Sequence, residues 1–164
     1  MATEEKPTVF WDSCIFISWL SGEERVDNSE TTGIEEMVFQ IDHNKMNLIL
    51  STLSRSETLF PKGNEKAQER FLSMLKLSNV QEIEVTPLIA QQAHDIQVDL
   101  MSKGNTITAP DAIQLATAMY LEINRFFTFD GTGKKQKLLH LNGHEALGGL
   151  EIIRPQPSMY PLGF

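Results

Sequence analysis

Four carboxylates interrupt apolar or small-residue stretches of the chain. They are Asp12 at the end of "VFWD", Glu57 in "LSRSETLF", Asp111 in "PDAIQLATA" and Asp130 at the end of "FFTFD". Gathered in one cleft, these groups would repel each other and could not all stay ionised without compensation. A divalent cation such as Mg²⁺ or Mn²⁺ prefers oxygen ligands and supplies that compensation. Such an ion can ready a water molecule and stabilise charge on phosphorus. The set therefore favours phosphoester cleavage.

Each acid also has a purely structural interpretation. Asp12 is suited to capping a helix that follows it. Asp111 falls in a first helical turn, where the helix dipole favours a negative charge by roughly 0.3–1 kcal/mol. Glu57 fits the surface of a short helix, and Asp130 fits the start of a turn. The structural interpretation is open for each residue alone, and the four together favour a site.

Alternating strands and helices must position these acids. The pattern predicts strands over 8–12, 47–51, 80–85, 125–129 and 150–155, with 80–85 at an edge. It predicts helices over 13–20, 34–46, 52–60, 65–77 and 88–103, a helix from Pro110, a short one in "KKQKLLHL" and a surface loop over 22–33. This alternation is typical of an α/β fold with a mainly parallel sheet covered on both faces. Asp12 and Asp130 would then end strands at the edge where such sheets bind ligands.

Composition limits the remaining possibilities. We expect the 164 residues to form a single domain, 1–164, with a core over about 8–155 and an irregular, proline-rich tail over 156–164. The net charge of −8 argues against nucleic-acid binding by charge alone, so an RNA ligand would need a local basic patch and a metal ion. Cys14 is the only cysteine, which excludes an internal disulfide. The acidic N-terminus and the absence of a long apolar run predict a cytoplasmic protein without a membrane span.

The motifs "VFWDSCIFI", "LSRSETL", "PDAIQLATAMYL" and "FFTFDGTGKK" resemble those of the PIN domains, a family of metal-dependent ribonucleases. The resemblance runs from about residue 8 to about residue 137. It implies a three-layer α/β/α sandwich in which Asp12, Glu57, Asp111 and Asp130 bind Mg²⁺ or Mn²⁺ and carry catalysis. Ser13 and Thr128 match polar positions that flank the acids in many members, and they would hold a carboxylate or a metal-bound water.

Many small members of the family are VapC-type toxins of type II toxin–antitoxin pairs, which cut RNA and commonly form dimers. The resemblance therefore implies an RNA substrate, an antitoxin partner and a homodimer. This chain is longer than most such toxins and is acidic, so a catalytically silent PIN-like module that binds a protein partner is the alternative. A haloacid-dehalogenase-like phosphatase is disfavoured, because Cys14 stands where that family has its second Asp.

Basic and aromatic side chains near the motifs have two interpretations each. Lys134, Lys135 and Lys137, and also Arg55, are candidates for RNA phosphate contacts, or else they form a solvated surface. The aromatic residues of the strands are expected in the core. Trp19 fits either the core or a surface that receives a partner helix.

Overall fold

The computed structural model describes residues 5–22, 28–58, 60, 62–131 and 137–161. Its centre is a five-stranded sheet in the order β3-β2-β1-β4-β5, and every neighbouring pair is parallel. The strands are β1 (Thr8–Trp11), β2 (Asn47–Ser51), β3 (Val80–Ile83), β4 (Arg125–Phe127) and β5 (Glu151–Ile153). The predicted parallel sheet is confirmed, and β3 lies at an edge as expected.

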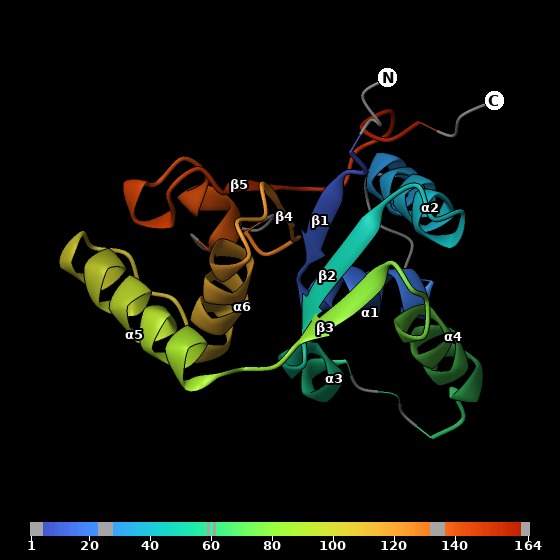
Figure 1. Cartoon of the computed structure of the whole chain (residues 1–164), viewed down its shortest axis with the longest axis horizontal. Coiled ribbons are helices and arrows are strands. Elements are labelled where there is room, and N and C mark those ends of the chain that lie inside the picture. Colours follow the sequence, from blue (N-terminus) through green and yellow to red (C-terminus); the bar gives the residue numbers. More distant parts are fainter. Residues whose placement is uncertain (1–4, 23–27, 59, 61, 132–136, 162–164) are drawn as a thin grey trace.

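Helices cover both faces of this sheet (Figure 1). One face carries α1 (Ser13–Ser21), α2 (Asn28–Asp42) and α4 (Glu65–Leu75), and the other carries α5 (Pro87–Ser102) and α6 (Ala109–Tyr120). The short α3 (Leu53–Glu57) follows β2. The chain thus forms the three-layer α/β/α arrangement, which is the predicted fold class.

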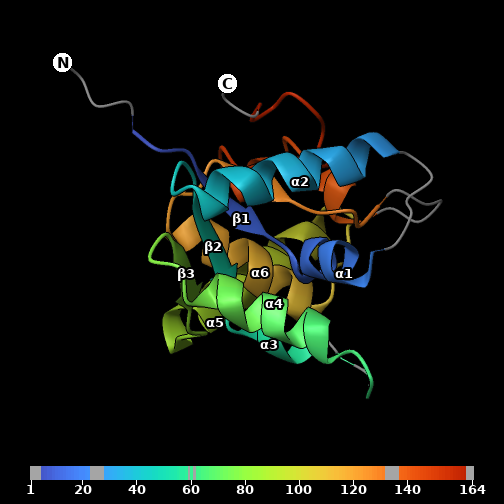
Figure 2. The same cartoon turned by 90° about the vertical axis from the view of Figure 1, so that its right-hand side faces the viewer.

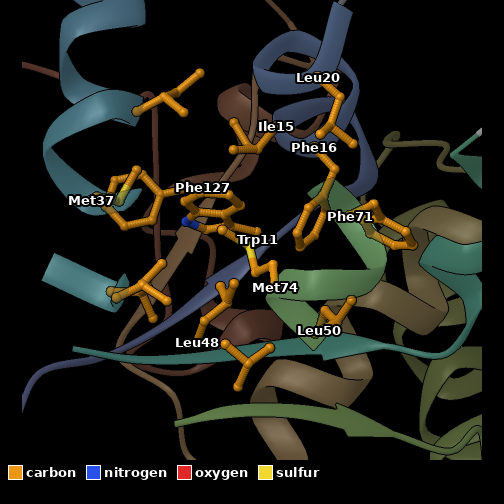
Figure 3. Packing of buried hydrophobic residues seen from close by; sticks show 14 of the residues in the cluster. Trp11, Ile15, Phe16, Leu20, Met37, Leu48, Leu50, Phe71, Met74 and Phe127 are labelled. Carbon is orange, nitrogen blue, oxygen red and sulfur yellow. The ribbon is translucent and has the colours of Figure 1, made fainter. Parts of the chain in front are cut away.

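The strand sequences explain why both faces are covered. In β1, Val9 and Trp11 pack towards α1, α2 and α4, whereas Phe10 packs towards α5 and α6. This alternation is the period of two that a strand imposes, and Val9, Phe10 and Trp11 are all apolar because neither face of the sheet meets water there. Figure 3 shows Trp11 among the buried side chains on the face covered by α1, α2 and α4. Its ring packs edge-on against that of Phe16, with 5.1 Å between the ring centroids. On the opposite face Phe10 stacks on Phe126.

Several element boundaries differ from the prediction. The region 22–33 was expected to be a loop, but α2 already begins at Asn28. Local sequence disfavours a helix there, and tertiary contacts override it: Glu30 is buried and pairs with Arg154 at 3.2 Å. Strand β4 ends at Phe127, so Asp130 lies beyond its last residue instead of ending it. In "KKQKLLHL" a short 3-10 helix spans Leu138–Leu141, and residues 134–136 lie outside the described residues.

The irregular segment after β5 passes over α2 (Figure 2). The Ser158 amide donates to Glu36 at 2.8 Å, and Gln40 donates to the Pro161 carbonyl at 2.6 Å. The backbone of Gln156 runs so close to Gly33 that no side chain fits between them. None of the described helices is long and apolar enough to cross a membrane.

Candidate metal centre

Asp12 follows β1 directly and caps α1, which is the structural role that its position predicted. Its Oδ1 accepts the Ser13 amide at 2.8 Å, and its Oδ2 accepts the Thr128 hydroxyl at 2.8 Å and the Cys14 thiol at 3.3 Å. Burial raises the pKa of Asp12 from its ordinary 3.8 to about 6, although the Thr128 and Cys14 hydrogen bonds oppose the rise. The charge of Asp111 raises this pKa further.

The Thr128 hydroxyl connects Asp12 to Asp130. While it donates to Asp12, it accepts the backbone N–H of Asp130 at 3.0 Å. The Asp130 carboxylate meets Lys137 Nζ at 3.2 Å and the amide of Leu138 at 3.4 Å. Thr128 is fully buried, so this connection between the ends of β1 and β4 is shielded from water.

Asp111 is the acid whose charge interacts with those of the other three. It occupies the first turn of α6 and is half-buried. Burial is the largest cause that raises the pKa of Asp111, and the charges of Asp130 and Glu57 raise it further while Lys137 lowers it. Asp111 also raises the pKa of Asp12, so Asp111 is electrostatically coupled to each of the other three predicted acids.

Glu57 reaches the cluster from the end of α3. Its Oε2 accepts hydrogen bonds from the Ser13 hydroxyl and, at 2.9 Å, from Gln114 Nε2. The amide of Gln114 also lies 3.0 Å from Ser13 Oγ and 3.3 Å from Ser54 Oγ. Gln114 and Ser54 were not predicted. The available signal was that Gln114 follows Asp111 by one helical turn in an otherwise apolar or small-residue stretch, and so shares its face.

The donor set fits a hydrated divalent cation. Among the described residues, no three His, Cys, Asp or Glu side chains are close enough together to hold a metal ion directly. Magnesium commonly uses one or two carboxylates and keeps several waters, so direct convergence of all four acids is not required. Burial is the largest cause of the raised pKa values of Asp12 and Asp111, and the charges of neighbouring acids add to it. A nearby cation would favour the ionised form of both carboxylates.

The predicted basic residues are only partly described. Arg55 is exposed, and its guanidinium binds both carboxylate oxygens of Glu82 at 2.6 Å. Lys137 pairs with Asp130, whereas Lys134 and Lys135 lie outside the described residues.

Trp19 packs against the core, which is one of its two predicted interpretations. The guanidinium of Arg70 lies 4.7 Å from the centre of its ring. Trp19 also borders an open cavity of about 610 Å³ formed by α1, α2 and α4. The lining is Trp19, Val38, Asp42, Lys66, Glu69, Arg70, Ser73, Met74 and Leu77.

Solved structures share this fold at low sequence identity. VapBC2 from Rickettsia felis, bound to a promoter DNA fragment, matches at 12% identity with a TM-score of 0.61, covering 89% of this chain and 97% of that chain. FitAcB from Neisseria gonorrhoeae matches at 15% identity with a TM-score of 0.59, covering 90% of this chain and 97% of that chain. VapC20 from Mycobacterium tuberculosis is described as a Sarcin-Ricin loop cleaving toxin. It matches at 16% identity with a TM-score of 0.55, covering 75% of this chain and 90% of that chain. No curated protein sequence matches the chain.

A sequence model of one family covers most of the chain. The PIN domain model matches residues 9–135, a range that contains Asp12, Glu57, Asp111 and Asp130. The matched range also contains α1 to α6, β2 to β4 and all of β1 except Thr8. This match, together with the parallel α/β/α architecture, shows that the chain belongs to the PIN domain family.

Proposed function

We propose that the chain is an endoribonuclease that hydrolyses RNA phosphodiester bonds with Mg²⁺ or Mn²⁺. The observation that supports this most is that Thr128 connects Asp12 to Asp130 by hydrogen bonds while Ser13, next to Asp12, donates to Glu57. The charges of Asp130 and Glu57 also raise the pKa of Asp111. Proteins of the PIN family are typically nucleases and generally use divalent metal ions. The solved neighbour described as cleaving the Sarcin-Ricin loop is consistent with RNA as the substrate.

The proposed chemistry divides between the ion and the chain. Asp12, Glu57, Asp111 and Asp130 would hold the ion. A bound Mg²⁺ or Mn²⁺ would supply activation of the attacking water and charge neutralisation at the phosphate, and hydrolysis would leave a 5′-phosphate and a 3′-hydroxyl. Ser13 and Thr128 fix the orientation of these acids, Ser13 through Asp12 and Glu57 and Thr128 through Asp12 and Asp130.

Basic side chains would offset the repulsion between RNA and a chain of net charge −8. We assign Lys134 and Lys135 to RNA phosphates, because they follow Asp130 in the sequence. The Arg55 guanidinium is hydrogen-bonded to both carboxylate oxygens of Glu82. Arg55 could therefore contact an RNA phosphate only if the phosphate replaced Glu82.

Cleavage of a mixed-sequence RNA by the purified full chain tests the proposal. We expect cleavage in Mn²⁺ or Mg²⁺, none after chelation with EDTA, and none with Asp12→Asn, which replaces a carboxylate by an amide of the same shape. Circular dichroism must show that the variant is folded. Cleavage by a folded Asp12→Asn protein free of wild-type enzyme would refute the four-acid site.

The cavity beside Trp19 supports a protein partner as a second element of function. Its wall combines apolar side chains with both signs of charge, which suits an amphipathic segment of another protein. One solved neighbour is a toxin–antitoxin complex from Klebsiella pneumoniae, with 18% identity and a TM-score of 0.54. We propose that an antitoxin segment occupies this cavity. A catalytically silent module would keep the same partner and cut no RNA.

We also propose a cytoplasmic homodimer. The apolar stripe of α4 is not available for it, because Ala67, Phe71 and Met74 are buried in the core. Helix α5 instead exposes Leu88 and Met101, which are 60% and 63% accessible. Analytical ultracentrifugation of the wild type and Met101→Glu tests the dimer. A wild-type monomer, or an undiminished dimer in the variant, would contradict this face.

A further inference from the structure

Gln114 is a buried polar side chain on an otherwise apolar and small-residue face of α6. Its side chain is 1% exposed, and its buried neighbours include Ala112, Leu115 and Ala118. A buried amide needs hydrogen bonds to offset its lost hydration, and each missing one destabilises the fold. Within the described part of the chain, Gln114 Oε1 has no hydrogen-bond partner. The unpaired Oε1 therefore destabilises the fold, so a benefit of the buried amide must come from its Nε2 group.

The Nε2 group of Gln114 faces Glu57. Nε2 lies 2.9 Å from Glu57 Oε2, 3.0 Å from Ser13 Oγ and 3.3 Å from Ser54 Oγ. The reversed amide would direct a carbonyl oxygen at the carboxylate, so the negative charge of Glu57 selects the orientation with Nε2 towards it. The Ser13 hydroxyl donates to the same oxygen. Both donors thus engage Oε2 from the protein interior, and no hydrogen bond within the described residues engages Oε1.

We propose that Gln114 is a positioning residue that orients the Glu57 carboxylate for a divalent cation, holding Oε2 so that Oε1 faces the cluster of acids. This inference rests on the proposed function. It assigns Gln114 no contact with the ion or with RNA. Residues that orient a metal ligand typically change metal affinity about 10–100-fold when they are removed, even though they do not touch the metal.

A substitution of similar size separates positioning from packing. Gln114→Leu keeps a side chain of comparable volume, although one bond shorter, and removes both the donor to Glu57 and the unpaired Oε1. Thr117→Val is the matched control, because Thr117 is also fully buried on α6 but donates only to the Ile113 carbonyl of its own helix. Gln114→Asn is a second variant that stays polar but is one methylene too short to reach Glu57.

The test is Mn²⁺ binding to the full-length chain, followed by electron paramagnetic resonance, which remains quantitative for weak binding. We expect Gln114→Leu and Gln114→Asn to weaken Mn²⁺ binding about tenfold or more, and Thr117→Val to leave it unchanged. In a Glu57→Gln background, Gln114→Leu should weaken Mn²⁺ binding no further, because it acts through Glu57.

The outcomes distinguish this inference from the proposed function. Wild-type affinity in a folded Gln114→Leu or Gln114→Asn protein overturns the role of Gln114 and leaves the metal site intact. An equal loss with and without Glu57 also overturns it, because that result indicates a general structural effect. A folded wild-type protein that binds no Mn²⁺ contradicts the proposed function itself, and the inference falls with it.

Discussion

The hydroxyl of Thr128 donates a 2.8 Å hydrogen bond to Asp12 Oδ2 and so ties the residue after β4 to the residue after β1. The same oxygen accepts the amide of Asp130 at 3.0 Å. One buried hydroxyl therefore fixes the distance between two acids that are far apart in the sequence. The parallel pairing of β1 with β4 makes this contact possible, because it brings both carboxyl ends to the same edge.

Replacing Thr128 with Val should uncouple the two acids. The substitution keeps the shape of the side chain but removes a donor to a buried carboxylate and an acceptor for the Asp130 amide. We expect the free energy of unfolding to fall by about 1–3 kcal/mol and Mn²⁺ affinity to fall about tenfold. Thr128→Ser, which keeps the hydroxyl, should restore both. Wild-type Mn²⁺ affinity in Thr128→Val would show that this hydroxyl does not organise the site.

The stability of the metal-free protein should depend on the charge of Asp12. Its pKa is about 6 in the folded protein against an ordinary 3.8, so the folded state holds the proton more tightly. Stability therefore falls as pH rises through this window, and the full loss, roughly 3 kcal/mol, is present above the folded pKa. The raised pKa of Asp111 acts in the same direction.

Asp12→Asn isolates this contribution from other titrating groups. Urea unfolding at about pH 5 and about pH 7, both in EDTA, should show the variant losing less stability between the two conditions than the wild type loses. Equal losses in the two proteins would mean that Asp12 titrates normally in the folded state.

The contact between α2 and the segment after β5 gives a prediction about stability alone. A Cβ on Gly33 would lie 2.6 Å from the backbone nitrogen of Gln156, which cannot move without displacing the segment. We expect Gly33→Ala to destabilise the protein by about 1–3 kcal/mol, as overpacking does. Gly149→Ala is the control, because nothing lies within 4 Å of its Cβ position. Similar melting temperatures for both variants would contradict the close packing of this segment.

A charged side chain in the cavity beside Trp19 should block the proposed antitoxin. Ser73 lines the cavity from α4, whereas Ser102 is an exposed serine at the end of α5. When the chain is co-expressed with the protein encoded beside it, we expect Ser73→Arg to abolish co-purification and Ser102→Arg to preserve it. Neither change should alter RNA cleavage by the isolated chain. Co-purification that survives Ser73→Arg would place the partner elsewhere.

The sequence predicted the fold features that depend on strand order and missed those that depend on tertiary contacts. Asp12 could be singled out as a candidate because an acid after an apolar strand stands out, and the structure places it directly after β1. Gln114 looked like one polar position in a helix, and only the folded chain shows that it meets Glu57. The start of α2 was missed for the same reason, since Glu30 is buried against Arg154 from the far end of the chain.

Calorimetric titration of Mn²⁺ into the wild type, Asp12→Asn and Asp130→Asn near neutral pH tests the shared metal site most directly. These acids follow different strands and meet only through the fold. We expect the wild type to bind Mn²⁺ and both variants to lose binding while circular dichroism shows them folded. Undiminished binding in either folded variant would contradict a single site built from these acids.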